Sequence, residues 1–304
     1  MNRTKIDWLG FRAKGDIRSV LTGLQGVFGP HGSMVSLNTR KNGWMGYESS
    51  EDIVLGGMVV GLMAHGGDNQ RGWVSVNITG RGCDWVSDWE EADDAMTKLK
   101  GYEHRRIDIA LDTFKREVTH ESVLAAYRSG QFAIHGKRPS LKRIEPEDPY
   151  EGRTIYVGKR DQGKFLRAYE KGFELVKKYP DMKVEFIDNV PIANIYRVEV
   201  EYKAKNGLLP EDMIEKRDQY FAGAYPYLQT VMNLEPEIFT QARERGPQRD
   251  LDAALKNIQH QYGKTLYTAL MALGGDVGAL MDKIVGKSHN EALVALGVLE
   301  VEHE

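Results

Sequence analysis

Residues 153–172 read RTIYVGKRDQGKFLRAYEKG, and the expected fold is built outward from this stretch. Residues 153–160 and 164–171 are two runs rich in β-branched, aromatic and charged side chains. A polar turn that ends in glycine, residues 161–163, separates them. This pattern predicts a β-hairpin.

Side chains alternate between the two faces of a strand, so the second run should place four residues on one face: Phe165, Arg167, Tyr169 and Lys171. A tyrosine between two cations can act as a nucleophile or pack as an amphipathic edge residue. The reference pKa of tyrosine is about 10, and neighbouring cations favour the phenolate. We therefore expect Arg167 and Lys171 to lower the pKa of Tyr169 and to hold a phosphate that it attacks.

Two further segments show the same strand alternation. In RIDIALD (106–112) and RVEVEYK (197–203), charged side chains share one face and apolar side chains the other. The charged faces carry four carboxylates: Asp108, Asp112, Glu199 and Glu201. If the strands are neighbours, these carboxylates converge near Tyr169.

Hard oxygen ligands of this kind suit Mg²⁺ or Mn²⁺, which can polarise a phosphoryl oxygen. This interpretation predicts a divalent-metal site for phosphoryl transfer. The alternative interpretation is a salt-bridged sheet face without chemistry.

The composition is that of an ordinary globular protein. The chain has 304 residues, 41% hydrophobic and 28% charged, and a net charge of −3. The single cysteine, Cys83, excludes an internal disulfide, and no apolar run reaches the length of a membrane span. We expect a cytoplasmic protein without a membrane partner.

The charge is unevenly distributed. Residues 137–178 contain 12 Lys and Arg against seven Asp and Glu, which favours a local polyanion-binding surface. The candidate DNA-binding residues are Lys137, Arg138, Lys142, Arg143, Lys159, Arg160 and Lys164. A solvated loop and hairpin would show the same charge pattern.

Strand-like segments and short helices alternate up to residue 205, and helical patterns follow. The sequence predicts an α+β fold: an antiparallel sheet flanked by helices over residues 1–205, and a helical region over 206–304. Residues 136–152 read as a connector. The helix at 251–270 has one apolar face, which either forms a dimer contact or packs on the sheet. Two shorter helices are expected at about 276–285 and 289–299.

The order of RIDIALD, TIYVGKRDQGKFLRAYEKG and YRVEVEY resembles the replication initiation factor family. This family includes rolling-circle plasmid and filamentous-phage initiators and related relaxases of conjugative elements. DWLGFRAKG near the start and VSVNITGRGC also resemble family segments, so the resemblance covers about residues 5–205. Lys159 stands where relatives often have serine.

The resemblance implies a curved antiparallel sheet and site-specific, metal-dependent nicking of one DNA strand at a replication origin. Tyr169 would form a 5′-phosphotyrosine and release a 3′-hydroxyl, and the four acids would supply metal ligands. The implied partners are origin DNA, duplex and single-stranded at the nick, a host helicase and a second copy of the chain. The alternatives are a conjugative relaxase and a non-catalytic origin-binding protein.

Overall fold

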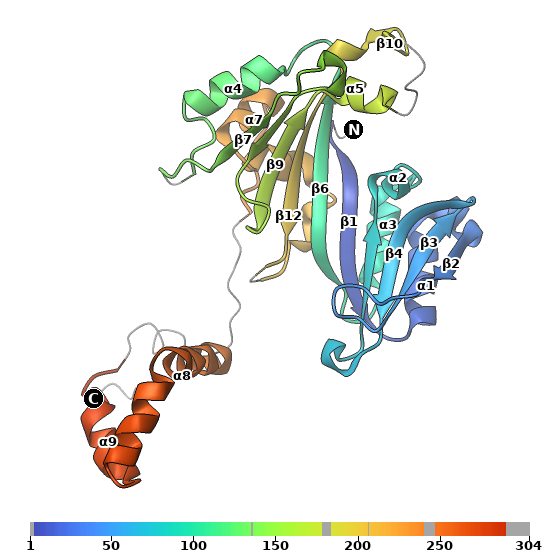
Figure 1. The fold of residues 1–304 in the computed structure, drawn as a ribbon. Helices are drawn as coiled ribbons and strands as arrows, with labels where there is room; N and C mark the ends of the chain where they lie inside the picture. Colours follow the sequence, from blue (N-terminus) through green and yellow to red (C-terminus); the bar gives the residue numbers. More distant parts are fainter. Residues whose placement is uncertain (1–2, 135, 178–183, 206, 240–246, 290–304) are drawn as a thin grey trace. The chain divides into compact units, whose positions relative to one another are not determined.

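Ten strands form one antiparallel sheet, in the order β2-β3-β4-β5-β1-β6-β12-β9-β8-β7 (Figure 1). The computed structural model describes residues 3–134, 136–177, 184–205, 207–239 and 247–289. The chain divides into two compact units, residues 1–241 and 242–304. The sheet belongs to the first unit, and the described part of the second unit is helical.

The strands of this sheet are β1 (Lys5–Lys14), β2 (Val35–Thr39), β3 (Ser49–Leu55), β4 (Met58–His65), β5 (Trp73–Ile78), β6 (Glu103–Thr113), β7 (Leu141–Ile144), β8 (Thr154–Val157), β9 (Lys164–Tyr169) and β12 (Tyr196–Lys203). A separate two-stranded ribbon consists of β10 (Phe186–Ile187) and β11 (Val190–Pro191).

The helices of the first unit are α1 (Ile17–Val27), α2 (Gly80–Cys83), α3 (Trp89–Thr97), α4 (His120–Arg128), α5 (Lys171–Val176), α6 (Arg217–Gly223) and α7 (Pro226–Met232). Short 3-10 turns are η1 (Gly29–Met34), η2 (Asp68–Gln70), η3 (Pro149–Glu151), η4 (Ile192–Asn194) and η5 (Glu211–Met213). The second unit contains α8 (Pro247–Ala272) and α9 (Val277–Ile284).

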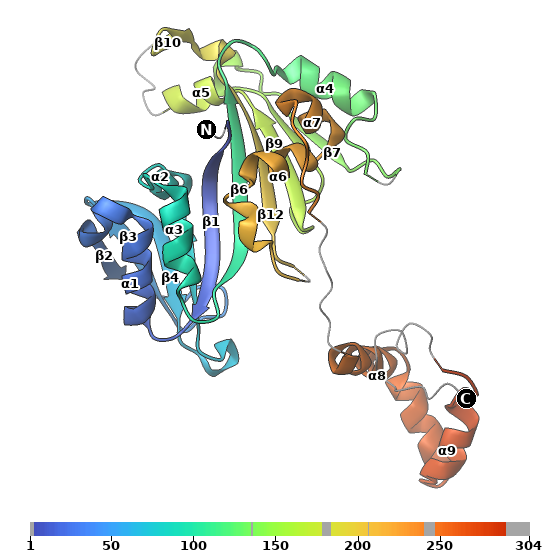
Figure 2. The ribbon, with the colours of Figure 1, turned by 180° about the vertical axis from the view of Figure 1, so that it is seen from behind.

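Helices α1, α3, α6 and α7 cover one face of the sheet and leave the other face open (Figures 1 and 2). Apolar side chains of the central strands form a buried core against these helices: Leu9 and Phe11 in β1, Val76 and Ile78 in β5, Ile107 and Ile109 in β6, and Val198 and Val200 in β12. The charged positions of the same strands point to the open face. The expected α+β fold, an antiparallel sheet flanked by helices, is confirmed.

The strand expected over 164–171 is shorter than predicted. β9 ends at Tyr169, and Lys171 begins α5. Gly172 accounts for this departure, because a Cβ there would lie only 2.0 Å from the Ile192 carbonyl oxygen. The close approach takes the chain out of the sheet, so Lys171 does not share a strand face with Tyr169.

The segment expected to be a connector, 136–152, contains the edge strand β7, which pairs with β8. The first unit also extends to residue 241, past the boundary expected after residue 205. Residues 207–239 belong to it because α6 and α7 pack on the sheet: Phe221 and Leu228 are fully buried, and the Tyr202 hydroxyl donates to the Tyr220 carbonyl over 2.7 Å.

In the second unit, the apolar residues Leu255, Ile258 and Tyr262 of α8 are about half exposed. The helix expected at 276–285 is present as α9. The helix expected at 289–299 lies, beyond its first residue, outside the described residues. No helix in the described part of the chain is long and apolar enough to cross a bilayer.

Candidate active site

The charged faces of β6, β12 and β9 form one continuous surface, because β12 lies between the other two strands. Three rows of side chains cross it. Arg197 lies opposite both Asp112 and Tyr169, and Glu199 lies opposite Ala110 and Arg167. Glu201 lies opposite Asp108 and Phe165. Tyr169 and the four predicted acids therefore lie on one face of the sheet, with Asp108 and Glu201 two rows, about 14 Å along the strands, from Tyr169.

Tyr169 is the last residue of β9, and only 6% of its surface is exposed. The Arg167 guanidinium lies 4.9 Å from the centre of its ring and the Lys171 ammonium 5.6 Å. Glu174 of α5 lies beside the Tyr169 side chain, where it can accept a hydrogen bond from the hydroxyl, and it pairs with Lys171 at 2.7 Å. The expected cations are in place, together with a carboxylate that was not expected.

The expected lowering of the Tyr169 pKa is wrong for the protein alone. Burial raises this pKa well above its usual value, and Arg197 and Arg167 only oppose the rise. Taking a phenolate out of water costs more than these cations return. Tyr169 is therefore a neutral phenol at physiological pH, and its proton must be removed during the reaction.

Arg197 connects its own strand, β12, to β6 and β1, and the sequence analysis gave it no role. Its guanidinium forms a bidentate pair with Asp112, at 2.5 and 2.7 Å, and a third bond of 2.7 Å to Asp7 of β1. Burial alone would raise the pKa of Asp112, but Arg197 and Lys5 outweigh it and lower that pKa. Both oxygens of Asp112 are thus committed to arginine.

Asp108 and Glu201 form a directly opposed carboxylate pair, each about 97% buried. Arg106 bridges them: it bonds to Asp108 at 2.5 and 2.8 Å and lies 2.9 Å from Glu201. Burial, with repulsion from Glu199 and Glu201, raises the pKa of Asp108 to about 7 even though Arg106 opposes the rise. Negative charge is therefore incompletely compensated here.

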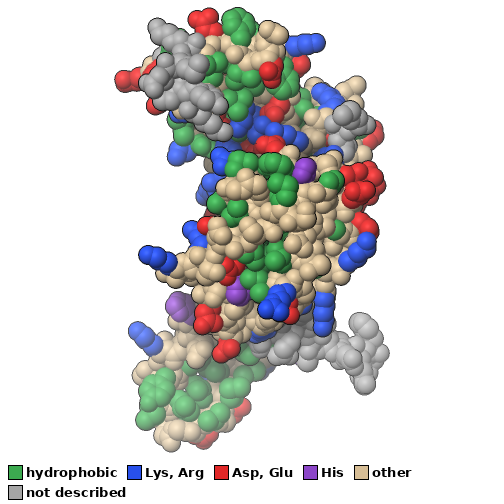
Figure 3. All heavy atoms as spheres, turned by 90° about the vertical axis from the view of Figure 1, so that its right-hand side faces the viewer, with side chains coloured by type: hydrophobic (Ala, Val, Ile, Leu, Met, Phe, Trp, Pro, Cys, Tyr) green, Lys and Arg blue, Asp and Glu red, His purple; other side chains and the backbone are tan. Residues whose placement is uncertain are grey.

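Glu199 and Glu201 also form ion pairs with cations. Arg167 lies 2.6 Å from Glu199, and Lys203 and Arg160 lie 2.6 and 3.3 Å from Glu201. In the space-filling view, Lys and Arg side chains lie beside Asp and Glu over the upper part of the molecule (Figure 3). Arginine and lysine heads thus screen the acidic cluster.

The donor chemistry of the cluster fits a divalent cation only in part. Among the described residues, no three His, Cys, Asp or Glu side chains lie close enough together to hold a metal ion as they stand. Asp108, Glu199 and Glu201 are nevertheless buried carboxylates on adjacent strands, and the pKa of Asp108 is raised first by burial and then by repulsion from Glu199 and Glu201, both of which a bound cation would offset. Asp112 does not fit, because Arg197 holds both of its oxygens.

The predicted DNA-binding residues separate into three places. Lys137, Arg138, Lys159 and Lys164 line one pocket of about 460 Å³. Lys142 and Arg143 lie on the edge strand β7, and Arg160 reaches the acidic cluster on the open face. Lys164 alternates with Phe165 and Arg167, so it points to the other face of the sheet from the site.

A further pair beside the site was also missed from the sequence. Arg153, just before β8, forms a multiple hydrogen-bonded pair with Glu170, including 2.8 Å to one carboxylate oxygen, and contacts Glu121 of α4 at 2.7 Å. Glu170 directly follows Tyr169, so this pair anchors the backbone that presents the tyrosine. Only the charge of these residues was visible in the sequence.

Residues 103–248 match the family model described as replication initiation factor. This segment is thus similar to replication initiation factor domains. The match begins at Glu103, where β6 begins, and it covers every strand of the charged face. The resemblance of the sequence to this family is confirmed, although the two family-like segments DWLGFRAKG and VSVNITGRGC lie outside the matched range.

A solved structure supports the fold around the matched segment. The chain is similar to a rolling-circle replication initiator protein from Geobacillus stearothermophilus, with a TM-score of 0.55 and 17% sequence identity. The superposition covers 78% of this chain and 99% of that chain. No curated protein matches the sequence significantly. The likeness thus supports the architecture beyond residues 103–248.

Proposed function

We propose that the chain nicks one strand of origin DNA through Tyr169 and so starts rolling-circle replication of a phage or plasmid. The observation that carries the proposal is the shared surface of β6, β12 and β9. It carries a tyrosine, Arg167 and three buried carboxylates, with Lys171 of α5 beside the tyrosine ring, inside the segment that matches the replication initiation factor model.

The reaction is an in-line displacement at phosphorus. The Tyr169 hydroxyl oxygen attacks the scissile phosphate, its bond to phosphorus forms and the bond from phosphorus to the 3′-oxygen breaks. Glu174 takes the phenol proton, because it is the carboxylate beside the Tyr169 side chain. Burial alone would raise the pKa of Glu174, but Lys171 and Arg167 outweigh burial and lower that pKa. The 3′-oxygen takes a proton from water and primes synthesis.

Arg167 and Lys171 bind the phosphate oxygens on the face of the tyrosine ring. Asp108, Glu199 and Glu201 would hold Mg²⁺ or Mn²⁺, which supplies charge neutralisation and polarisation of a phosphoryl oxygen. Arg197 positions the strands, since its three bonds to Asp112 and Asp7 tie β12 to β6 and β1. A host helicase and a second copy of the chain belong to the proposal as further partners.

The test is formation of a covalent protein–DNA adduct. The chain is incubated with single-stranded and supercoiled origin DNA of its own replicon, with Mn²⁺, with Mg²⁺ or with EDTA. We expect an adduct at Tyr169, identified by peptide mapping, only when a divalent ion is present. Binding without any adduct under all three conditions would favour a non-catalytic origin-binding protein, and an adduct at a transfer origin instead would favour a relaxase.

A further inference from the structure

The pocket lined by Lys137, Arg138, Lys159 and Lys164 is separate from the tyrosine site and contains no acidic side chain. Its volume is about 460 Å³, and its other lining residues are apolar or neutral, including Ile134, Pro139 and Tyr225. None of the four cations forms an ion pair with a carboxylate in the described part of the chain. The pockets beside Tyr169 and beside α3 both include glutamates.

Lys164 is the most informative of these cations. It is largely buried, its ammonium donates to the Ala224 carbonyl, and it lies 4.4 Å from the centre of the Tyr225 ring. Burial lowers its pKa to about 8. A buried ammonium without a carboxylate partner is costly unless an anion approaches.

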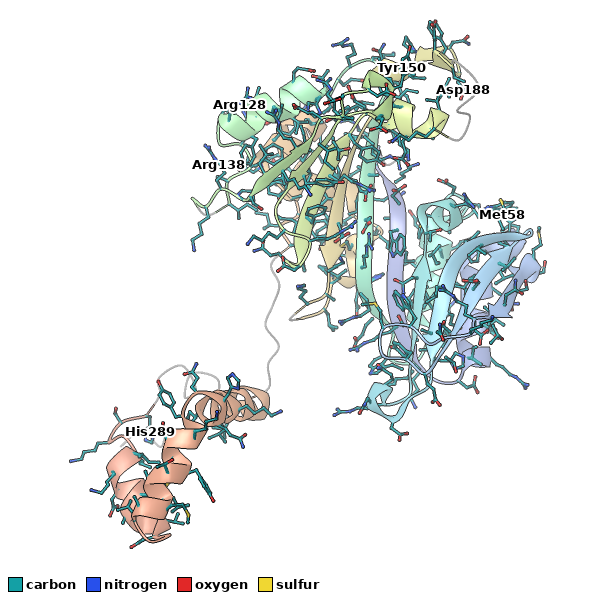
Figure 4. The ribbon with its side chains drawn as sticks, viewed as in Figure 1. Met58, Arg128, Arg138, Tyr150, Asp188 and His289 are labelled. Carbon is teal, nitrogen blue, oxygen red and sulfur yellow. The ribbon has the colours of Figure 1, made fainter. Side chains whose placement is uncertain are left out.

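The walls of the pocket are preformed by hydrogen bonds between two loops. Gly158 donates to the Ser140 carbonyl over 2.8 Å, and the Ser140 hydroxyl donates back to the Gly158 carbonyl over 3.1 Å. Gly158 has a φ of +90°, a conformation that favours glycine. Pro139 is held by the Tyr127 hydroxyl over 2.6 Å. Figure 4 shows Arg138 at the outer edge of the sheet, near Arg128 of α4.

The β8–β9 turn connects this pocket with the tyrosine site. Lys159 lines the pocket, while its neighbour Arg160 reaches Glu201 on the open face at 3.3 Å. On that face the Tyr156 and Phe165 rings stack 5.5 Å apart at 21°, with Arg160 5.6 Å from the Phe165 ring. From Lys164 to Tyr169, β9 spans about 17 Å.

We propose that this pocket binds one unstacked nucleotide of the single DNA strand that leaves Tyr169 and passes around the β8–β9 turn. The inference rests on the proposed nicking function. The cations would pair with the phosphate, and the apolar walls would contact sugar and base. The Tyr156–Phe165 stack would support the bases between the two sites, as aromatic side chains do in single-strand grooves.

The test uses Lys137→Gln/Lys159→Gln and, as a matched control, Lys98→Gln/Lys100→Gln at the exposed end of α3, all in a Tyr169→Phe background. Binding of fluorescent single-stranded origin oligonucleotides is measured by anisotropy across a salt series. We expect the pocket variant to bind at least about tenfold more weakly and its salt slope to fall by up to about 1.4. The control should stay within twofold of Tyr169→Phe alone.

Oligonucleotide length gives the decisive readout. Shortening the DNA stepwise from one side of the nick, and from one side only, should abolish the difference between the pocket variant and its control. Equal losses in both variants, or a difference that persists on the shortest oligonucleotide, would overturn the proposal. Thermal melts check folding, and Arg138→Gln serves as a second variant with the same expected length dependence.

Two further measurements complete the test. The first asks whether a free nucleotide or the DNA strand occupies the pocket, and the second tests the proposed nicking function independently of the pocket. Millimolar dTMP should compete weakly with the long oligonucleotide, and dTMP binding without any length-dependent oligonucleotide effect would overturn the strand assignment. With Tyr169 restored, the unsubstituted chain and the Lys98→Gln/Lys100→Gln control should both form the adduct on a short oligonucleotide. If no adduct forms with either protein, the nicking function fails while the binding series still decides the pocket.

Discussion

The two halves of the sheet have the same strand order but carry different side chains on the open face. From the centre outward, the two halves have the equivalent strand orders β1-β5-β4-β3-β2 and β6-β12-β9-β8-β7. Along the chain, α1 or α4 follows the first strand of each half. Two helices follow the strand that comes last along the chain, β5 or β12. The halves meet where β1 and β6 pair antiparallel. No repeat is visible in the sequence, so the common plan is carried by polar alternation and burial rather than by residue identity.

The open faces of the halves differ at corresponding positions. The row Tyr169–Arg197–Asp112 crosses β9, β12 and β6, and the corresponding row across β4, β5 and β1 is Ala64–Ser75–Arg12. Arg12 pairs with Glu103 at 2.6 Å and lies over Trp73 at 4.1 Å. The architecture is therefore not sufficient for the site, and the following predictions test the half that carries Tyr169 against the half whose corresponding row has no tyrosine or carboxylate.

The largest effect is expected at Tyr169. Tyr169→Phe removes the attacking oxygen and little packing, so adduct formation should fall by about 10⁴-fold or more while DNA binding is retained. The measurement is denaturing electrophoresis of labelled DNA with Mn²⁺. The matched control is Tyr156→Phe, on the same open face, which should still form the adduct. An adduct with Tyr169→Phe would move the nucleophile elsewhere, with Tyr156 of the same open face as the next residue to change.

The carboxylates should come second. Glu199→Gln or Glu201→Gln should slow nicking by about 10²–10³-fold, because each removes a charged oxygen ligand and leaves an arginine partner. In the other half, Asn77→Ala should change the rate less than about twofold. Rates come from single-turnover nicking over a Mn²⁺ titration. Nicking by the unsubstituted chain that resists EDTA would remove the metal from the proposal.

The salt dependence of DNA binding should be smaller but measurable. Replacing Lys137, Arg138, Lys142 and Arg143 with alanine should flatten the salt slope by up to about one unit per lost phosphate contact. Binding to unrelated DNA should weaken equally, because phosphate contacts carry no sequence information. The control replaces four exposed cations of the other half: Arg18, Lys41, Arg81 and Lys98. An unchanged slope in the first variant would make the basic stretch a solvated loop.

The smallest effect concerns stability and pH. The pKa of Asp108 in the folded chain, about 7, lies above its unfolded value near 4, so the native state binds an extra proton between these values. This contribution to stability is present at low pH and is lost as pH rises from about 4 to 7. Asp108→Asn should therefore melt a few degrees above the unsubstituted chain at pH 8 and equally at pH 4. A lower melting temperature at pH 8 would show that Arg106 already compensates the charge.

Much of the fold was predictable because it depends on local alternation. The apolar positions of RIDIALD and RVEVEYK lie in the core, and their charged positions lie on the same sheet face as Tyr169. The partners of those charges were not predictable, since cross-strand register decides that Arg197 faces Asp112 rather than Asp108. The burial that raises the Tyr169 pKa, and the approach of Glu174, depend on Gly172 turning the chain onto Ile192.

The seam between β1 and β6 has a practical consequence for anyone who isolates the matched domain. A fragment that starts at Glu103 would lose β1, and the 11 residues of β6 would become a sheet edge with unpaired amides and carbonyls. Long edges of this kind recruit other strands. Such a fragment would self-associate along β6 or precipitate. In the whole chain, β1 covers this edge of β6, so the first half keeps the half that carries the tyrosine from pairing with other strands.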